Sequence, residues 1–260
     1  MNYPQYLKTK KNPPATLTQV AYTETYHRFV QFLAQGDRTP TAEAVDAFLF
    51  ALSCKGCKAN TLNRHLAGLK SYFKFLGQPL NIESYHLPSK LRVWLTNEDK
   101  ERYEAAAVTP FEKAIIRVFL GTGIRLGELC GLQRSDLTTE ARGGGYLRVT
   151  GKGSIESIVT VNERTLTVIQ DYLQTRTDTD ARMFPRSRVV ISQVVSGIGR
   201  RCGLRVTPHL LRHTFAGQWL AKGGKLHHLQ GQLRHKSLAT TSIYVHSVPT
   251  ERLEEMPDTI

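Results

Sequence analysis

The sequence is poor in cysteine, and this shortage excludes several kinds of site. Only 4 of the 260 residues are cysteines. Cys54 and Cys57 form a C-x-x-C pair, but a structural zinc site needs a second pair, and Cys130 and Cys202 stand alone. We therefore expect no bound metal and no structural disulfide.

Long hydrophobic segments are also missing. No apolar run approaches the roughly 18 residues of a membrane-spanning helix. Residues 1–16 are polar and contain prolines and lysines instead of the apolar centre of a signal peptide. We expect these residues to form a flexible N-terminal tail, and the protein to be soluble, cytoplasmic and without a membrane partner.

Acidic residues are outnumbered by basic ones. The chain has 22 Asp and Glu against 35 Lys and Arg, which gives a net charge of +13. Such a charge indicates an acidic partner, and nucleic acid is the first candidate, although proteins that bind anionic membranes share this property.

The most informative segment spans residues 207–244. Thr207 and Pro208 predict a helix start, because a hydroxyl caps free amides and proline lacks the amide hydrogen that would be left unpaired there. His209 and Arg212 then share one helix face. Each side chain alone is typical of an ordinary helix surface. Together, cations and imidazoles without matching carboxylates suit a phosphate group. Tyr244 would need such help as a nucleophile, because the pKa of a phenol is about 10.

This segment resembles the C-terminal signature of the tyrosine recombinases, the family of phage-type integrases and Xer-like site-specific recombinases. That signature reads H-x-x-R-H-T-F-A, then L-G-H, then a tyrosine about nine residues later. The chain has H-L-L-R-H-T-F-A from His209, L-R-H ending at His235, and Y at Tyr244. Arg234 replaces the usual glycine. We expect Arg234 to adopt an ordinary helical backbone and to add one more phosphate-facing cation.

Two further segments extend the resemblance. The stretch G-T-G-I-R-L-G-E-L from Gly121 resembles the first arginine box of the family, which places Arg125 beside the scissile phosphate with Glu128 in reach to orient it. Alternating apolar residues over 143–161 predict a β-hairpin. The resemblance implies that Lys152, in its turn, protonates the departing 5′-oxygen. An exposed Arg125–Glu128 pair and a solvated turn lysine are the ordinary alternatives.

The resemblance implies a metal-independent transesterification. Tyr244 would attack the phosphorus to give a 3′-phosphotyrosyl intermediate, which conserves the bond energy, so that rejoining needs no ATP. Arg125, Arg212 and His235 would stabilise the charge on the non-bridging oxygens, and His209 would accept the phenolic proton. Because side chains supply the cations, we expect no cofactor.

Residues 17–76 predict a small helical domain with three amphipathic segments. Six polar or basic residues lie on or just before the third segment, away from its apolar stripe: Lys55, Lys58, Asn63, Arg64, Lys70 and Lys74. They could form an ordinary solvated face. The net charge and the resemblance, which implies an N-terminal SAM-like core-binding domain, favour contact with the DNA backbone.

The expected fold is mainly α-helical with a small antiparallel β-sheet, in two domains. Residues 77–92 have little periodicity and predict a linker. Residues 93–260 would then form the catalytic domain. The resemblance implies double-stranded DNA as partner and a homo-tetramer on paired recombination sites, with a monomer as the expected free form. The short N-terminal stretch leaves no room for an arm-binding domain, which favours a Xer-like mode.

The segment after Tyr244 has Leu253 among the acidic residues Glu251, Glu254 and Glu255. It could be a frayed end. The resemblance implies that such tails dock on a neighbouring subunit.

Two other functions stay open. One is a catalytically silent DNA-binding accessory protein of the same fold, which would need a subtle defect such as Arg234. The other is a monomeric nicking-closing enzyme like the type IB topoisomerases, although the separate helical domain and the L-x-H box fit recombinases better. The sequence does not reveal the target site, nor whether the role is integration, dimer resolution or inversion.

Overall fold

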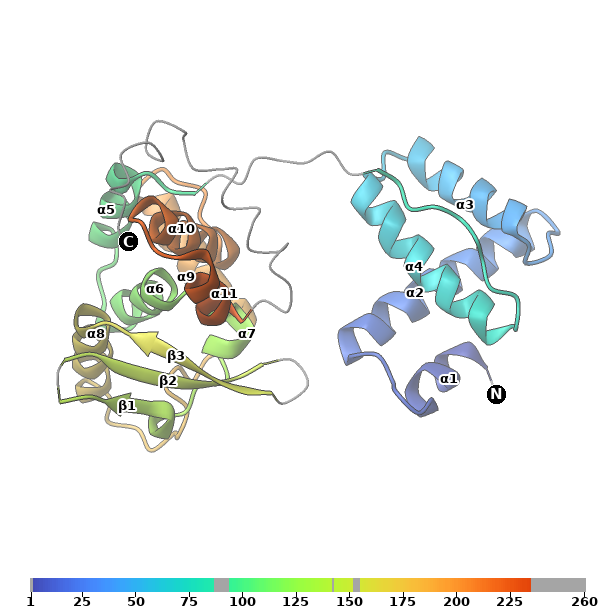
Figure 1. Ribbon diagram of the computed structural model, residues 1–260. Helices are drawn as coiled ribbons and strands as arrows, with labels where there is room; N and C mark the ends of the chain where they lie inside the picture. Colours follow the sequence, from blue (N-terminus) through green and yellow to red (C-terminus); the bar gives the residue numbers. More distant parts are fainter. Residues whose placement is uncertain (1, 87–93, 142, 152–154, 235–260) are drawn as a thin grey trace. The chain divides into compact units, whose positions relative to one another are not determined.

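Figure 1 shows a computed structural model of the protein, which describes residues 2–86, 94–141, 143–151 and 155–234. The chain divides into two compact units, Met1–Lys90 and Leu91–Ile260. The described residues are mainly helical and contain a sheet of three antiparallel strands. The expected fold class is therefore confirmed.

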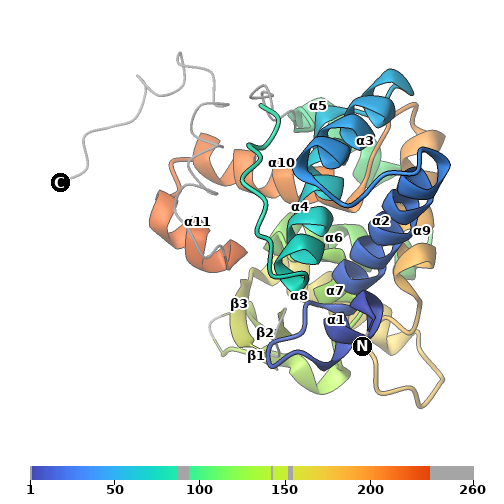
Figure 2. The ribbon, with the colours of Figure 1, turned by 90° about the vertical axis from the view of Figure 1, so that its right-hand side faces the viewer.

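The described part of the N-terminal unit has four helices: α1 (Tyr3–Thr9), α2 (Thr16–Gln35), α3 (Ala42–Cys54) and α4 (Ala59–Phe75). Helices α2, α3 and α4 are the three predicted segments, and they pack against one another, as Figure 2 also shows. Their core contains Phe29, Phe48, Leu66 and Leu69, all buried. The helical periodicity therefore placed this core correctly.

Part of the segment expected to be a flexible tail, Tyr3–Thr9, forms helix α1. The Asn2 side chain accepts a hydrogen bond of 3.0 Å from the Gln5 amide, and Gln5 caps Asn2 in return. Tyr3 and Leu7 of α1 are buried, and α1 packs against α2 and α4. Only two buried positions hold this short helix, too few to form a recognisable apolar period.

Part of the expected linker also packs on the N-terminal unit. The segment after α4 turns back along this helix (Figure 1), and Leu80 and Ile82 pack against its core. The Asn63 amide group accepts a hydrogen bond from the Tyr85 backbone N–H at 2.7 Å and donates one to the Tyr85 carbonyl at 2.9 Å. The packed structure thus extends beyond residue 77, where the linker was expected to begin.

The described part of the second unit is built around α6. Its helices and one 3₁₀ turn are α5 (Asn97–Ala105), α6 (Pro110–Thr122), α7 (Leu126–Leu129), η1 (Arg134–Asp136), α8 (Glu163–Gln174), α9 (Arg188–Arg201), α10 (Pro208–Ala221) and α11 (Leu226–Leu233). Thr109 and Glu112 form a capping box at the start of α6. This helix packs against α8, α9, α10 and the sheet (Figure 1). It is buried on most sides, and its C-terminal end leads directly into the turn that carries Arg125.

The predicted β-hairpin is present. Strands β1 (Leu137–Thr139), β2 (Gly145–Thr150) and β3 (Glu156–Val161) form the antiparallel sheet in the order β1-β2-β3. Leu147 pairs with Val159 and both are buried. The next pair, Arg148 and Ile158, faces the other side of the sheet and is exposed. This alternation is the period-2 signal that the sequence carried.

Candidate catalytic site

A sharp turn after α6 presents Arg125. Gly123 ends α6 with φ of 65°, and a Cβ there would lie 2.4 Å from Cδ1 of Phe215. Both the left-handed backbone and the close approach require glycine. The turn makes Arg125 the N-cap of α7. Its side chain stays 47% exposed, so its guanidinium is accessible to a ligand.

Glu128 holds Arg125 in two ways. Its Oε2 accepts a hydrogen bond of 2.7 Å from the Arg125 backbone N–H, and its Oε1 accepts one of 2.9 Å from Arg125 Nη1. The Glu128 side chain is only 5% exposed. The pair is therefore not the exposed helix-surface contact that the sequence left open, because one partner is a buried carboxylate that orients the other.

Arg212 joins two distant segments at the same place. Thr207 caps α10 through a 3.1 Å bond from the Leu210 N–H, as predicted. The buried Arg212 then donates from Nη1 to the Gly123 carbonyl at 2.5 Å and from Nη2 to the Leu233 carbonyl at 2.7 Å. It thereby fixes the turn before Arg125 to the end of α11.

His209 lies one turn before Arg212 on the same helix face. It is exposed, and its ring centroid lies 4.4 Å from that of His213. The start of α7 thus carries Arg125 and Glu128, and α10 carries His209 and Arg212. The bond from Arg212 to the Gly123 carbonyl joins α10 to the turn before α7.

Arg234 contradicts the expectation made for it. It is the C-cap of α11 with φ 54° and ψ 47°, a left-handed and not a helical backbone. Its side chain is 11% exposed, and Nη2 donates to Glu128 Oε2 at 2.5 Å. Arg234 is therefore not a free phosphate-facing cation, because its guanidinium is paired with the carboxylate that also holds Arg125.

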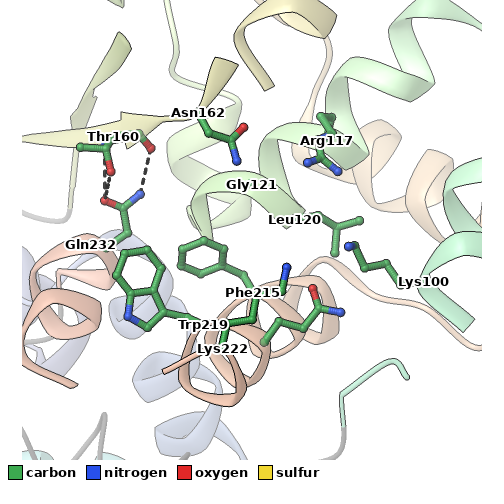
Figure 3. Close-up of a pocket in the computed structure, with 11 residues that line it drawn as sticks. Lys100, Arg117, Leu120, Gly121, Thr160, Asn162, Phe215, Trp219, Lys222 and Gln232 are labelled. Carbon is green, nitrogen blue, oxygen red and sulfur yellow. Dashed lines mark hydrogen bonds between the residues drawn. The ribbon is translucent and has the colours of Figure 1, made fainter. Parts of the chain in front are cut away.

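Gln232 is a structural residue of the site that sequence reasoning missed. Its buried Oε1 accepts hydrogen bonds from the Thr160 N–H at 3.2 Å and the Thr160 hydroxyl at 2.9 Å, and its Nε2 donates to the Thr160 carbonyl at 3.0 Å. These bonds attach α11 to β3 (Figure 3). No local sequence pattern signals this contact, because Thr160 lies 72 residues away in the sequence.

A pocket of about 220 Å³ opens beside this contact. Figure 3 shows Trp219 and Gln232 on one side of it and the cationic ends of Lys100 and Arg117 on the other. Lys222 also lines it. The lining is aromatic and basic, which suits a partner with apolar and acidic groups.

The charge of Glu128 is stabilised by its partners. Burial alone would raise its pKa, but the Arg125 amide, the Arg234 guanidinium and the Arg125 guanidinium together lower the pKa below the ordinary value. Glu128 therefore stays ionised at neutral pH.

Three of the expected catalytic residues, Lys152, His235 and Tyr244, lie outside the described residues. Of the expected DNA-contacting residues, Lys55, Lys58, Arg64 and Lys74 are exposed, whereas Lys70 is partly buried. Asn63 instead binds the Tyr85 backbone with its side-chain amide. The side-chain amide of Asn63 thus has an intramolecular role, and its contact with DNA stays a prediction.

Within the part of the chain that the structure describes, no three His, Cys, Asp or Glu side chains are grouped so that they could hold a metal ion. Cys54, Cys57, Cys130 and Cys202 are free thiols. Among the described helices, none is both long and apolar enough to cross a membrane.

The chain matches known protein families over most of its length. Residues 2–78 match the phage integrase N-terminal SAM-like domain, and residues 72–251 match the phage integrase family. The tyrosine recombinase XerA of Pyrococcus furiosus is 35% identical over 244 residues, which cover 86% of this chain and 82% of that relative.

Solved structures agree in fold. The crystal structure of XerA recombinase has a TM-score of 0.57 and 27% identity, and the match covers 97% of this chain and 94% of that one. XerH site-specific recombinase in a post-cleavage complex with a palindromic difH substrate has a TM-score of 0.76 and 22% identity, over 92% and 78% of the two chains. The resemblance seen in the motifs is thereby confirmed. The chain belongs to the phage integrase family and is a tyrosine recombinase, an enzyme of site-specific DNA recombination.

Proposed function

We propose that the chain cleaves and rejoins double-stranded DNA through a 3′-phosphotyrosyl intermediate formed by Tyr244. The observation that carries this proposal is the convergence of Arg125 and Arg212 at the turn after α6. A buried carboxylate orients the first, and two backbone carbonyls hold the second. Two preorganised guanidinium groups are the donors that a phosphoryl transition state needs.

In this mechanism the phenolate oxygen of Tyr244 bonds to phosphorus while the bond to the 5′-oxygen breaks. His209, exposed at the start of α10, takes the phenolic proton. Lys152 gives a proton to the departing 5′-oxygen. Arg125, Arg212 and His235 stabilise the added negative charge on the non-bridging oxygens. Rejoining reverses these steps with a different 5′-hydroxyl.

The N-terminal unit would bind the DNA backbone with the exposed Lys55, Lys58, Arg64 and Lys74. Phosphate contacts of this kind position a protein without reading bases. The XerH structure contains its DNA substrate, which supports the same kind of partner for this chain. We place the reaction in the cytoplasm, where such DNA lies in a prokaryotic cell.

We further propose a homo-tetramer on paired sites, joined by the segment after Tyr244. In the pocket of Figure 3, Lys100, Arg117 and Lys222 line the wall with Trp219. Arg117 and Lys100 already contact Glu104 at 2.8 and 4.0 Å, so the exposed Lys222 supplies the main positive charge here. It complements Glu251, Glu254 and Glu255 of a second copy, and the apolar wall suits Leu253. A Lys222→Glu variant should bind single sites normally but form fewer tetramers, as measured by light scattering on paired-site DNA. Unchanged tetramer formation in this variant and in Leu253→Asp would contradict the contact.

The central test is covalent capture. Wild type and Tyr244→Phe are incubated in EDTA with nicked suicide substrates, duplexes made from the ends of the host element. The proposal expects a denaturant-stable protein–DNA adduct with wild type and none with Tyr244→Phe. Binding without an adduct would instead favour the accessory protein. An adduct formed by a protein that stays monomeric on paired sites would favour the topoisomerase-like enzyme.

A further inference from the structure

We propose that Arg234 is a positioning residue for Arg125 and acts through the shared carboxylate of Glu128. This inference rests on the proposed function, in which Arg125 binds the scissile phosphate. Arg234 stands where the L-G-H signature of the family has glycine, so the chain carries a side chain at a position where the signature has none.

The backbone at Arg234 is unfavourable for a side chain. Asp37 and Arg234 are the non-glycine residues with positive φ in the described ranges, at 46° and 54°. A left-handed backbone persists at a non-glycine residue when the surroundings compensate for it. At Arg234 this compensation comes from the two Nη atoms. The buried Nε finds no hydrogen-bond partner among the described residues.

The left-handed turn sends the Arg234 side chain inward. Nη1 donates to the Gln232 carbonyl at 2.9 Å, and Nη2 donates to Glu128 Oε2 at 2.5 Å. Gln232 is itself bonded to β3 through Thr160. The two terminal nitrogens of the Arg234 guanidinium are therefore bonded to α11, through Gln232, and to Glu128.

Glu128 divides its two oxygens between the two arginines. Oε2 accepts from the Arg125 backbone N–H and from Arg234, while Oε1 accepts from the Arg125 guanidinium. Arg234 thus locks the carboxylate so that a single oxygen faces Arg125 Nη1. Without Arg234, only the Arg125 backbone N–H would hold Oε2, and the carboxylate could turn both oxygens toward the Arg125 fork more easily.

The charges lead to the same conclusion. Arg125 and Glu128 alone form a neutral pair, whereas Arg125, Glu128 and Arg234 together carry one net positive charge. Glu128 and Arg234 are 5% and 11% exposed, so water screens their charges less than those of surface groups, and this difference reaches a phosphate bound by Arg125. Arg234 keeps the carboxylate from cancelling the charge that Arg125 offers to the non-bridging oxygens.

The test compares single-turnover cleavage of suicide substrates by wild type, Arg234→Gly and Arg234→Lys. Glycine suits the left-handed backbone, so Arg234→Gly should fold and bind DNA normally but cleave roughly 10-fold more slowly, a size typical of coupled side chains. Lysine keeps the positive charge but lacks the planar guanidinium that bonds both Gln232 and Glu128. Arg234→Lys should therefore cleave faster than Arg234→Gly but more slowly than wild type. Asp37→Gly relieves the same backbone strain in the other unit and should leave cleavage unchanged.

Two readouts separate positioning from a merely structural role. With a scissile methylphosphonate, which lacks the negative charge, the defect of Arg234→Gly should shrink. In a Glu128→Gln background, Arg234→Gly should add nothing, because the link to Arg125 is already lost.

Equal slowing on both substrates, additive effects with Glu128→Gln, or an unchanged rate in Arg234→Gly would overturn the inference. In each of these cases the wild-type adduct still forms, so the proposed function survives. A wild type that forms no adduct would overturn both.

Discussion

The Arg212 guanidinium donates a hydrogen bond to the Leu233 carbonyl over 2.7 Å, at the last residue of α11. A second bond reaches the Gly123 carbonyl, at the turn before Arg125. An arginine proposed to bind phosphate therefore also holds together the two segments that form its surroundings. Its replacement should affect stability and catalysis at once.

We expect Arg212→Lys to reduce both. Lysine lacks the fork that reaches two carbonyls, so one buried carbonyl would lose its partner, at a cost of about 1–3 kcal/mol in the free energy of unfolding. Adduct formation should fall roughly 100-fold or more, as for loss of one oxyanion donor. Urea unfolding and suicide-substrate cleavage measure the two effects. Arg102→Lys, at an exposed arginine of α5, is the matched control and should change neither. Normal stability in Arg212→Lys would contradict the bridging role.

Glu128 should make the stability depend on pH. Its pKa in the folded protein is lowered, since the Arg125 amide and both guanidinium groups outweigh the raising effect of burial. A carboxyl group with a lowered folded pKa contributes stability that is present above its unfolded pKa, about 4.3, and is lost as the pH falls through the folded pKa. Unfolding free energies measured from about pH 7 down to about pH 3 should therefore drop less steeply in Glu128→Gln than in wild type. Parallel curves would show that the ion pairs contribute no net stability.

Much of this site could be predicted because its signals are local. Thr207 and Pro208 define the start of α10 by capping chemistry alone, and the spacing of His209 and Arg212 then fixes their common face. Arg125 and Glu128 are likewise close in sequence. The hairpin followed from alternation, because buried Leu147 and Val149 are separated by exposed Arg148.

What escaped prediction depends on distant contacts. Arg234 adopts a left-handed backbone where α11 ends, and its side chain bonds to Glu128, which lies 106 residues earlier in the sequence. Gln232 is buried because Thr160 satisfies it. Helix α1 is held on the unit by contacts such as that of the Tyr3 hydroxyl with the Gly68 carbonyl of α4. None of these partners can be read from the residues next to each position.

Helix α1 should contribute to the stability of the N-terminal unit. The Tyr3 hydroxyl donates to the Gly68 carbonyl at 3.2 Å, and burial raises the pKa of Tyr3 to about 12. We expect Tyr3→Ala to lower the free energy of unfolding by about 3–5 kcal/mol, as for other large buried aromatic residues. Tyr3→Phe should cost about 1 kcal/mol, because only the hydrogen bond is lost. Both are measured by urea unfolding, with Lys11→Ala, at an exposed position beyond α1, as the control. If Tyr3→Ala unfolded like wild type, residues 1–16 would be a tail after all.

The basic face of the N-terminal unit should bind DNA through phosphates and not through bases. Arg64 and Lys74 are exposed on α4, so each can reach the DNA backbone without disturbing the core. We expect Arg64→Ala and Lys74→Ala each to weaken binding about equally on specific and unrelated duplexes. Each should also reduce the dependence of log K on log salt by about one unit.

Asn63→Ala is the informative comparison on the same helix. Its amide is bonded to the Tyr85 backbone, so its loss should loosen the segment after α4 and leave the salt dependence unchanged. Fluorescence anisotropy over a series of salt concentrations measures all three variants. An unchanged slope for both Arg64→Ala and Lys74→Ala would place the DNA on another face of this unit. A reduced slope for Asn63→Ala would instead show that phosphate contacts depend on the bond between Asn63 and Tyr85.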